Sequence, residues 1–266
     1  MVINDRHIEL SLDPELFPET VEFFTKHVDD EISAYELATA LVQRDKTADM
    51  PRELFDFIVS LYKTAIDEDN TDAMNDLGAL YYDGRGCEQD FTKAVYYYDM
   101  AAKAGCRQAQ ENLGYCYYYG RNMPVDYGKA FHYFALGAFD GHLISLYKIG
   151  DMYQNGYYVE KNPKEAFNIY IHCLDLMTDE AAKLVAGPIY LRIGNALLNG
   201  NGVEENPKNA LVAFQRAELY LYDMVMDGDE MYKKSLQAAI DGQAKARAKL
   251  AEGLPKQEWI IDNPIN

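Results

Sequence analysis

The sequence contains little of what metal, redox or disulfide chemistry requires. Its 266 residues include four cysteines, five histidines and one tryptophan. The cysteines form no C-x-x-C pair and no regular spacing, so we expect reduced thiols rather than a disulfide framework. The histidines are scattered along the chain, and His132 and His142 are interpreted as packing residues. The sequence therefore predicts no metal site and no cofactor.

Basic residues are also scarce. Lysine and arginine total 25 against 43 aspartates and glutamates, which makes the net charge −18. Nucleic acid binding needs Lys and Arg to replace the counterions of the phosphates, so this balance predicts no nucleic-acid partner. It equally disfavours anionic membrane surfaces. The charge is typical of a soluble acidic protein, and a basic partner is the functional alternative.

Long apolar runs are missing as well. No stretch approaches 18 apolar residues, so we expect no transmembrane helix. The first residues, Met1–His7, lack the apolar core of a secretory signal. The sequence predicts a cytoplasmic protein, with export as a leaderless effector left open.

Catalytic motifs are not found either. The sequence contains no phosphate-binding loop, no G-x-S-x-G and no H-E-x-x-H. Neighbouring carboxylates such as Asp67-Glu68-Asp69 fall at expected helix ends, where they are interpreted as solvated loops. We therefore expect no catalytic residue and no enzyme.

What the chain does contain is one recurring phrase. It begins as Leu77-Gly78, continues with Tyr81 and ends with Gly84-x-Gly86. The phrase returns at Leu113-Gly114, Ile149-Gly150 and Ile193-Gly194. Its first glycines are 36, 36 and 44 residues apart, and such self-similarity is the mark of a solenoid.

Each copy of the phrase predicts a pair of helices. In the first helix, Leu77, Gly78 and Tyr81 share one broad face at 100° per residue. A glycine inside a helix costs about 1 kcal/mol relative to alanine, so its recurrence indicates a second helix crossing at close range. Glycine just past the helix end, as at Gly84, suits a left-handed cap. Asn162-Pro163 and its counterpart Asn206-Pro207 then begin the second helix.

This pattern resembles the Sel1-like repeat, a relative of the tetratricopeptide repeat, over residues 73–220. The first copy matches nearly throughout, while Asn122 and Tyr158 replace the second loop glycine in the next two. About eight residues are inserted before the fourth copy, around Thr178–Gly187. The resemblance implies an all-α fold, a right-handed solenoid of antiparallel helix pairs, used in the family mainly as an adaptor or scaffold.

The repeat spacing also predicts how the chain is divided. We expect an N-terminal helical cap with a degenerate repeat, four repeats, and a C-terminal capping helix with a tail. The corresponding residues are 1–70, 71–106, 107–142, 143–186, 187–224 and 225–266.

The flanks are helical in pattern but lack the phrase. Residues 33–67 are interpreted as the degenerate repeat, and residues 229–251 as one long helix. The apolar Trp259-Ile260-Ile261 follows a stop signal. It is expected either to fold back onto the last repeat or to dock on another chain.

The helical wheel identifies a candidate binding surface. The first helices line the concave groove in this superfamily, and the face opposite their packing stripe is polar. It mixes carboxylates, amides, cations and tyrosines, and amides can hydrogen-bond an extended peptide backbone. The predicted residues are Asp76, Asp83, Asn112, Tyr115, Tyr119, Lys148, Asp151, Asn155, Arg192, Asn195 and Asn199.

Two functional hypotheses follow. The first is a non-enzymatic adaptor whose concave face holds a protein or peptide. The alternative is a structural protein that self-associates, for instance as a homodimer, through its atypical cap and its apolar tail.

Overall fold

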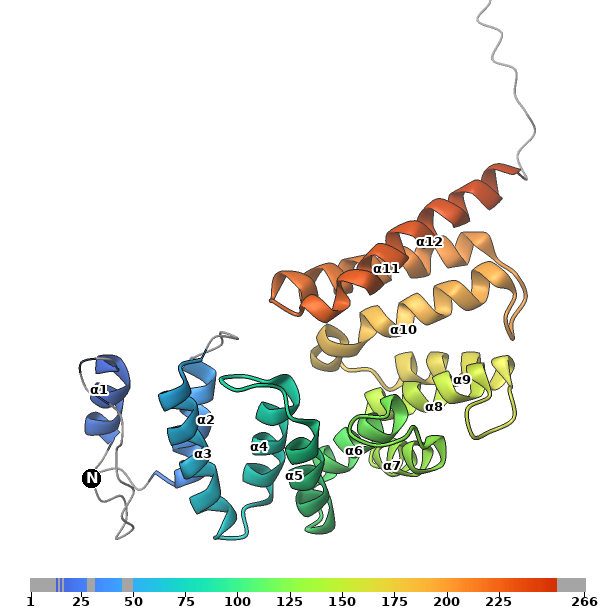
Figure 1. Cartoon of the computed structure of the whole chain (residues 1–266). Coiled ribbons are helices and arrows are strands. Elements are labelled where there is room, and N and C mark those ends of the chain that lie inside the picture. The colour runs from blue at the N-terminus through green and yellow to red at the C-terminus, as the bar shows by residue number, and fades with distance from the viewer. Residues whose placement is uncertain (1–12, 14, 16, 28–31, 45–49, 253–266) are drawn as a thin grey trace, which may run out of the picture. The chain divides into compact units, whose positions relative to one another are not determined.

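The computed structural model describes residues 13, 15, 17–27, 32–44 and 50–252. Over these residues the chain is all-helical, with no β-strand, as Figure 1 shows. The helices are α1 (Pro18–His27), α2 (Ala34–Arg44), α3 (Arg52–Ile66), α4 (Thr71–Asp83), α5 (Phe91–Lys103), α6 (Arg107–Tyr119), α7 (Tyr127–Phe139), α8 (Leu143–Asn155), α9 (Pro163–Asp175), α10 (Asp179–Asn199), α11 (Pro207–Met226), the 3₁₀ turn η1 (Glu230–Tyr232) and α12 (Lys233–Glu252). The all-α prediction is confirmed.

The chain forms two compact units, Met1–Leu136 and Gly137–Asn266. We call them unit 1 and unit 2.

Unit 1 is built from helices that pack in sequence order, α2 on α3, α3 on α4, α4 on α5 and α5 on α6. Its core joins α3 to the first helices of the repeats through fully buried side chains such as Phe55, Ile58, Leu77 and Leu113. The helices predicted within residues 33–67 are confirmed. Ser33 caps α2, because its hydroxyl accepts the Glu36 N–H while the Glu36 carboxylate accepts the Ser33 N–H.

The helix ends follow the predicted local rules. Gly84, which ends α4, has a left-handed φ of 72°, and the glycines that end α6, α8 and α10 do the same. The side chains of Asn162 and Asn206 accept the N–H groups of Glu165 and Asn209, so both predicted N-caps are confirmed.

The recurring glycine inside each first helix does mark a close helix crossing. A Cβ added at Gly78 would come within 2.8 Å of the Tyr98 ring, and one at Gly114 within 2.9 Å of the Phe134 ring. In unit 2, Gly150 faces Tyr170 in the same way. Each glycine therefore leaves room for an aromatic ring of the paired helix, and this packing offsets its poor helix propensity.

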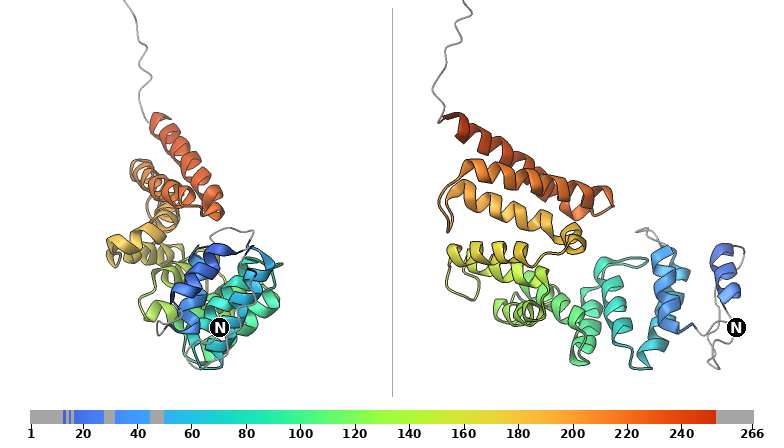
Figure 2. Two further views of the ribbon diagram at one scale, coloured as in Figure 1. Left: turned by 90° about the vertical axis from the view of Figure 1, so that its left-hand side faces the viewer. Right: turned by 180° about the vertical axis from the view of Figure 1, so that it is seen from behind.

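In unit 2, α8 packs on α9, and α10, α11 and α12 lie side by side, as the views of Figure 2 agree. The predicted insertion around Thr178–Gly187 forms the first two turns of α10. The Thr178 hydroxyl accepts the Ala181 N–H, and Asp179 and Glu180 place negative charge at the positive helix end. These turns pack against the C-terminal half of α11, where Gly187 contacts Leu221.

The C-terminal helix differs from its prediction at one end. Instead of one helix from residue 229, the chain forms η1 and then α12, which ends at Glu252. Gly228, with φ at 102°, and the turn around it separate α11 from η1. The predicted tail segment Trp259-Ile260-Ile261 lies outside the described residues.

Candidate functional site

Two of the predicted surface residues of unit 1, Asp76 and Asn112, belong to a short chain of hydrogen bonds. The hydroxyl of Tyr35 donates to Asp76 Oδ2 over 3.2 Å, and the Asn75 amide donates to Asp76 Oδ1 over 3.1 Å. The Asn112 amide in turn donates to Asn75 Oδ1 over 3.0 Å. Asp76 and Asn112 are therefore half-buried groups that tie successive first helices together.

Three other predicted residues of unit 1 are more accessible. Tyr115 and Tyr119 stack at 6.2 Å between ring centroids, with Tyr119 48% exposed. Asp83 is exposed at the end of α4. Tyr119 also lies 5.7 Å from the guanidinium of Arg121. The C-terminal end of α6 thus carries a stacked pair of tyrosine rings, one of which is exposed.

The Asp76 carboxyl supplies a pH-dependent prediction. Burial raises the pKa of Asp76 above its ordinary value of 3.8, and the bonds from Asn75 and Tyr35 only partly oppose this. The folded state therefore holds the proton more tightly than the unfolded chain. The corresponding stability is fully present below pH 3.8 and is lost as pH rises through the raised pKa.

Asp76→Asn is accordingly expected to raise the free energy of unfolding at pH 7 and to have a smaller effect near pH 3. Urea denaturation followed by circular dichroism across this range measures the difference. Asp179→Asn is the control, because Asp179 is exposed in the first turn of α10, away from Asp76, and favours that helix through the helix dipole. A D76N variant less stable than the parent at pH 7 contradicts the prediction.

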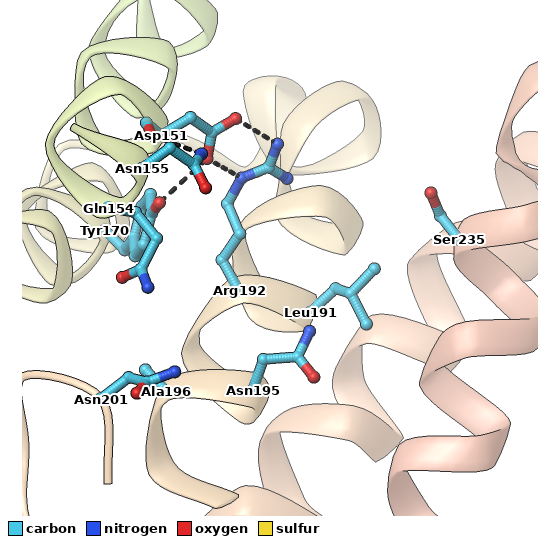
Figure 3. Close-up of a pocket in the computed structure, with 10 residues that line it drawn as sticks. All are labelled: Asp151, Gln154, Asn155, Tyr170, Leu191, Arg192, Asn195, Ala196, Asn201 and Ser235. Carbon is cyan, nitrogen blue, oxygen red and sulfur yellow. Dashed lines mark hydrogen bonds and ion pairs between the residues drawn. The ribbon is translucent and has the colours of Figure 1, made fainter. Parts of the chain in front are cut away.

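In unit 2, four of the predicted residues line an open pocket of about 400 Å³. It lies mainly between α8 and α10, with one residue from α12 (Figure 3). We call it the amide pocket, because four of its lining side chains are amides. The lining residues are Asp151, Gln154, Asn155, Tyr170, Leu191, Arg192, Asn195, Ala196, Asn201 and Ser235.

An ion pair forms one wall of the amide pocket. Arg192 Nε donates to Asp151 Oδ1 over 2.5 Å, and Arg192 Nη2 donates to Asp151 Oδ2 over 2.6 Å. This two-pronged geometry matches the planar guanidinium to the carboxylate. The Tyr170 hydroxyl donates to Asp151 Oδ1 over 2.9 Å, as Figure 3 shows. Asp151 is only 9% exposed, so these partners replace the water it has lost.

Arg192 is held from further sides. Its Nη1 donates to the Pro188 carbonyl over 2.9 Å, and its guanidinium lies 4.6 Å from the centroid of the Tyr147 ring. Burial by itself would lower the pKa of Arg192, but the Asp151 carboxylate, together with Tyr147 and Tyr170, raises it above its ordinary value. Arg192 therefore remains charged and fixed in place.

The amides of the pocket have hydrogen-bonding capacity to spare. Asn155 donates its Nδ2 to the Asp151 carbonyl over 2.7 Å, which leaves its amide oxygen as an acceptor. The side chains of Gln154, Asn195 and Asn201 have no partner within the described part of the chain. A side-chain amide both donates and accepts, which matches the N–H and C=O groups of a peptide backbone.

The structure thus unites Asp151, Asn155, Arg192 and Asn195 of the predicted set in one pocket. Lys148 is buried instead, with its Nζ 4.0 Å from Asp151 Oδ2. Asn199 is exposed outside the pocket and donates to the Asn195 carbonyl.

The repeat pattern did not predict the other lining residues. Asn201 had a usable signal, because it stands between the two glycines that close the repeat phrase. Ser235 had none, since it comes from α12, outside the repeats. Among the described residues, no three His, Cys, Asp or Glu side chains converge closely enough to hold a metal ion. None of the described helices is long and apolar enough to cross a bilayer.

Antiparallel helix pairs with one glycine–aromatic crossing in each define a helical repeat protein of the α-solenoid class. The chain belongs to the Sel1 repeat family, whose model matches residues 71–106, 107–142, 143–171 and 190–217. The predicted resemblance is confirmed. No protein of curated function matches the sequence.

Solved structures share the fold. A Sel1 repeat protein from Oxalobacter formigenes is 22% identical, with a TM-score of 0.60 over 88% of this chain and 95% of that one. A protective antigen of uropathogenic Escherichia coli strains, displaying an SLR fold, is 18% identical, with a TM-score of 0.51 over 90% of this chain and 57% of that one. At these identities the likeness establishes the solenoid fold alone.

Proteins of this family share a general kind of function. Sel1 repeats generally mediate protein–protein interaction, and proteins built from them are typically non-catalytic adaptors.

Proposed function

We propose that the protein is a non-enzymatic adaptor that holds an extended segment of a partner protein in the amide pocket of unit 2. The observation behind the proposal is the set of amides with unused hydrogen-bonding capacity, arranged around a fixed ion pair. A peptide in extended conformation presents a backbone N–H and C=O at every residue, and burying them requires partners of both kinds.

The pocket also keeps the entropic cost of binding low. Arg192 and Asp151 are held in place before a ligand arrives, so little side-chain entropy remains to be lost there. Leu191 and Ala196 provide apolar contact on the same wall. Recognition would rest mainly on the peptide backbone, with side-chain selectivity set by this small apolar area.

Replacing Asn155, Asn195 and Asn201 together by alanine tests the proposal. Partners are first captured from a lysate with the parent chain, and the bound segment is mapped to a peptide. The affinity of that peptide is then measured by fluorescence anisotropy. Three lost hydrogen bonds at about 0.5–1.5 kcal/mol each predict a rise in Kd of about tenfold or more.

Asn168→Ala provides the matched control, because Asn168 is an exposed amide on α9 outside the pocket. It is expected to leave the affinity unchanged. An unchanged Kd for the triple variant would show that the pocket is not the binding site.

A further inference from the structure

The outer face of α11 carries an apolar stripe that the fold does not use. Val212, Leu219, Tyr222 and Met226 are 47%, 60%, 53% and 66% exposed. At 100° per residue they fall within about 80° of one another, and they extend for about 21 Å along the helix. We call these four residues the α11 stripe.

The α11 stripe points away from the core of unit 2. The buried residues of α11 that pack toward α10 and α12, such as Phe214, Ala217 and Leu221, fall on the opposite side of the helix. The matching helix of the first repeat, α5, exposes one large apolar side chain, Tyr96. Single exposed apolar side chains are common on protein surfaces, whereas four in a row on one helix face indicate an interaction surface.

The stripe lies largely beyond the repeat itself. The match to the family ends at residue 217, while Leu219, Tyr222 and Met226 occupy the extension of α11. This extension packs against the two added turns of α10 (Figures 1 and 2). Packing accounts for the buried side of the extension but not for its exposed apolar side.

Charge at the C-terminal end of the stripe indicates the kind of partner. Asp223 and Asp227 occupy the end of α11 and Asp229 follows, while the last turn has no basic side chain. Negative charge at the negative end of a helix is unfavourable for the helix alone. The nearby Lys233 is already paired with Glu230 at 2.7 Å. Arg216, midway along α11, donates to the Tyr190 hydroxyl.

We propose that the α11 stripe docks an amphipathic helix of a partner protein, with apolar residues facing the stripe and Lys or Arg facing Asp223, Asp227 and Asp229. Four turns of α11 match the apolar face of a partner helix of similar length. The basic groups would relieve the repulsion at the helix end, and their attraction would speed encounter. This surface is separate from the amide pocket.

The test uses the full chain and a fluorescein-labelled 18-residue synthetic helix with leucine at i, i+3, i+4 and i+7 and lysine elsewhere. Anisotropy is expected to show binding that weakens as salt increases. Leu219→Gln with Met226→Gln should raise Kd by about tenfold or more, because two large apolar contacts are lost. Asp223→Asn, Asp227→Asn and Asp229→Asn together should weaken binding severalfold and flatten its salt dependence.

Two matched controls locate the site. Leu176→Gln changes a comparably exposed leucine at the end of α9 and should leave Kd unchanged. The triple amide variant of the pocket should also bind the helix normally, so failure of the pocket and failure of this surface are distinguishable. A peptide with glutamate in place of lysine should not bind.

Four outcomes overturn the proposal. One is an unchanged Kd for the leucine–methionine variant, and another is equal binding of a peptide whose leucines are serines. A third is much tighter peptide binding after truncation at Glu252, which would make residues 253–266 the occupant. The last is a dimer in light scattering that the leucine–methionine variant dissociates, which would make a second copy the occupant.

Discussion

Phe214→Ala is expected to lower the free energy of unfolding of the protein by about 3–5 kcal/mol. The Phe214 ring is fully buried in unit 2. It lies between two helices, with Gly194 of α10 on one side and Gly242 of α12 on the other. Removing it leaves a cavity whose glycine walls have no side chains with which to fill it.

Substituting a glycine beside the ring tests the same packing in a second way. A Cβ at Gly194 would come within 2.7 Å of the ring, and one at Gly242 within 2.6 Å. Overpacking costs about 1–3 kcal/mol, which matches or exceeds the gain of about 1 kcal/mol in helix propensity from glycine to alanine. Gly194→Ala is therefore expected to destabilise the protein or to leave it no more stable.

A double-mutant cycle identifies the cause. Phe214→Leu replaces the ring with a smaller side chain. Gly194→Ala should therefore lower the free energy of unfolding less in the F214L variant than in the parent. Val212→Ala is the control on the same helix, because Val212 is exposed and its loss is expected to cost at most about 0.5 kcal/mol. Urea denaturation followed by circular dichroism measures all four variants. Additive effects of G194A and F214L would contradict the packing explanation.

Asp151→Ala is the second change with a large expected effect, a loss of about 3–5 kcal/mol in the free energy of unfolding. The substitution leaves the Arg192 guanidinium with only its bond to the Pro188 carbonyl and its contact with the Tyr147 ring. The Tyr170 hydroxyl loses its recorded acceptor as well. A buried charge without its counter-charge is costly because the interior cannot solvate it.

The loss in the free energy of unfolding comes mainly from leaving Arg192 without a counter-charge, and less from losing the attraction within the pair. Asp151→Leu combined with Arg192→Met should therefore be more stable than Asp151→Ala alone. The exposed pair of Lys103 and Asp99, joined at 2.5 Å, supplies the contrast. Asp99→Ala is expected to cost at most about 1 kcal/mol because water screens that pair. Equal losses for D151A and D99A would show that the Asp151 network contributes no more than a surface contact.

The Asp151 prediction also bears on function. Arg192 forms a wall of the amide pocket, and Asp151 holds its orientation. A folded Asp151→Asn variant is thus expected to bind the mapped peptide more weakly than the parent, even though no amide is changed.

Much of this protein was determined by its sequence alone, because the rules involved are local. The repeat phrase predicted the helix pairs, the left-handed Gly84 and the caps at Asn162 and Asn206 from residues a few positions apart. The glycine at position 78 even predicted a close crossing, since its cost within a helix needed a packing reason.

Tertiary structure decided what the polar residues do. A helical wheel treats each helix by itself, so it assigned Lys148 and Asp151 to the same face as Asn155. The structure buries Lys148 and Asp151, because Arg192 arrives from a helix 41 residues further along the chain and closes over Asp151. Some polar residues support the amide pocket, and others line it with free hydrogen-bonding groups. Which residue does which depends on packing between helices that are distant in sequence.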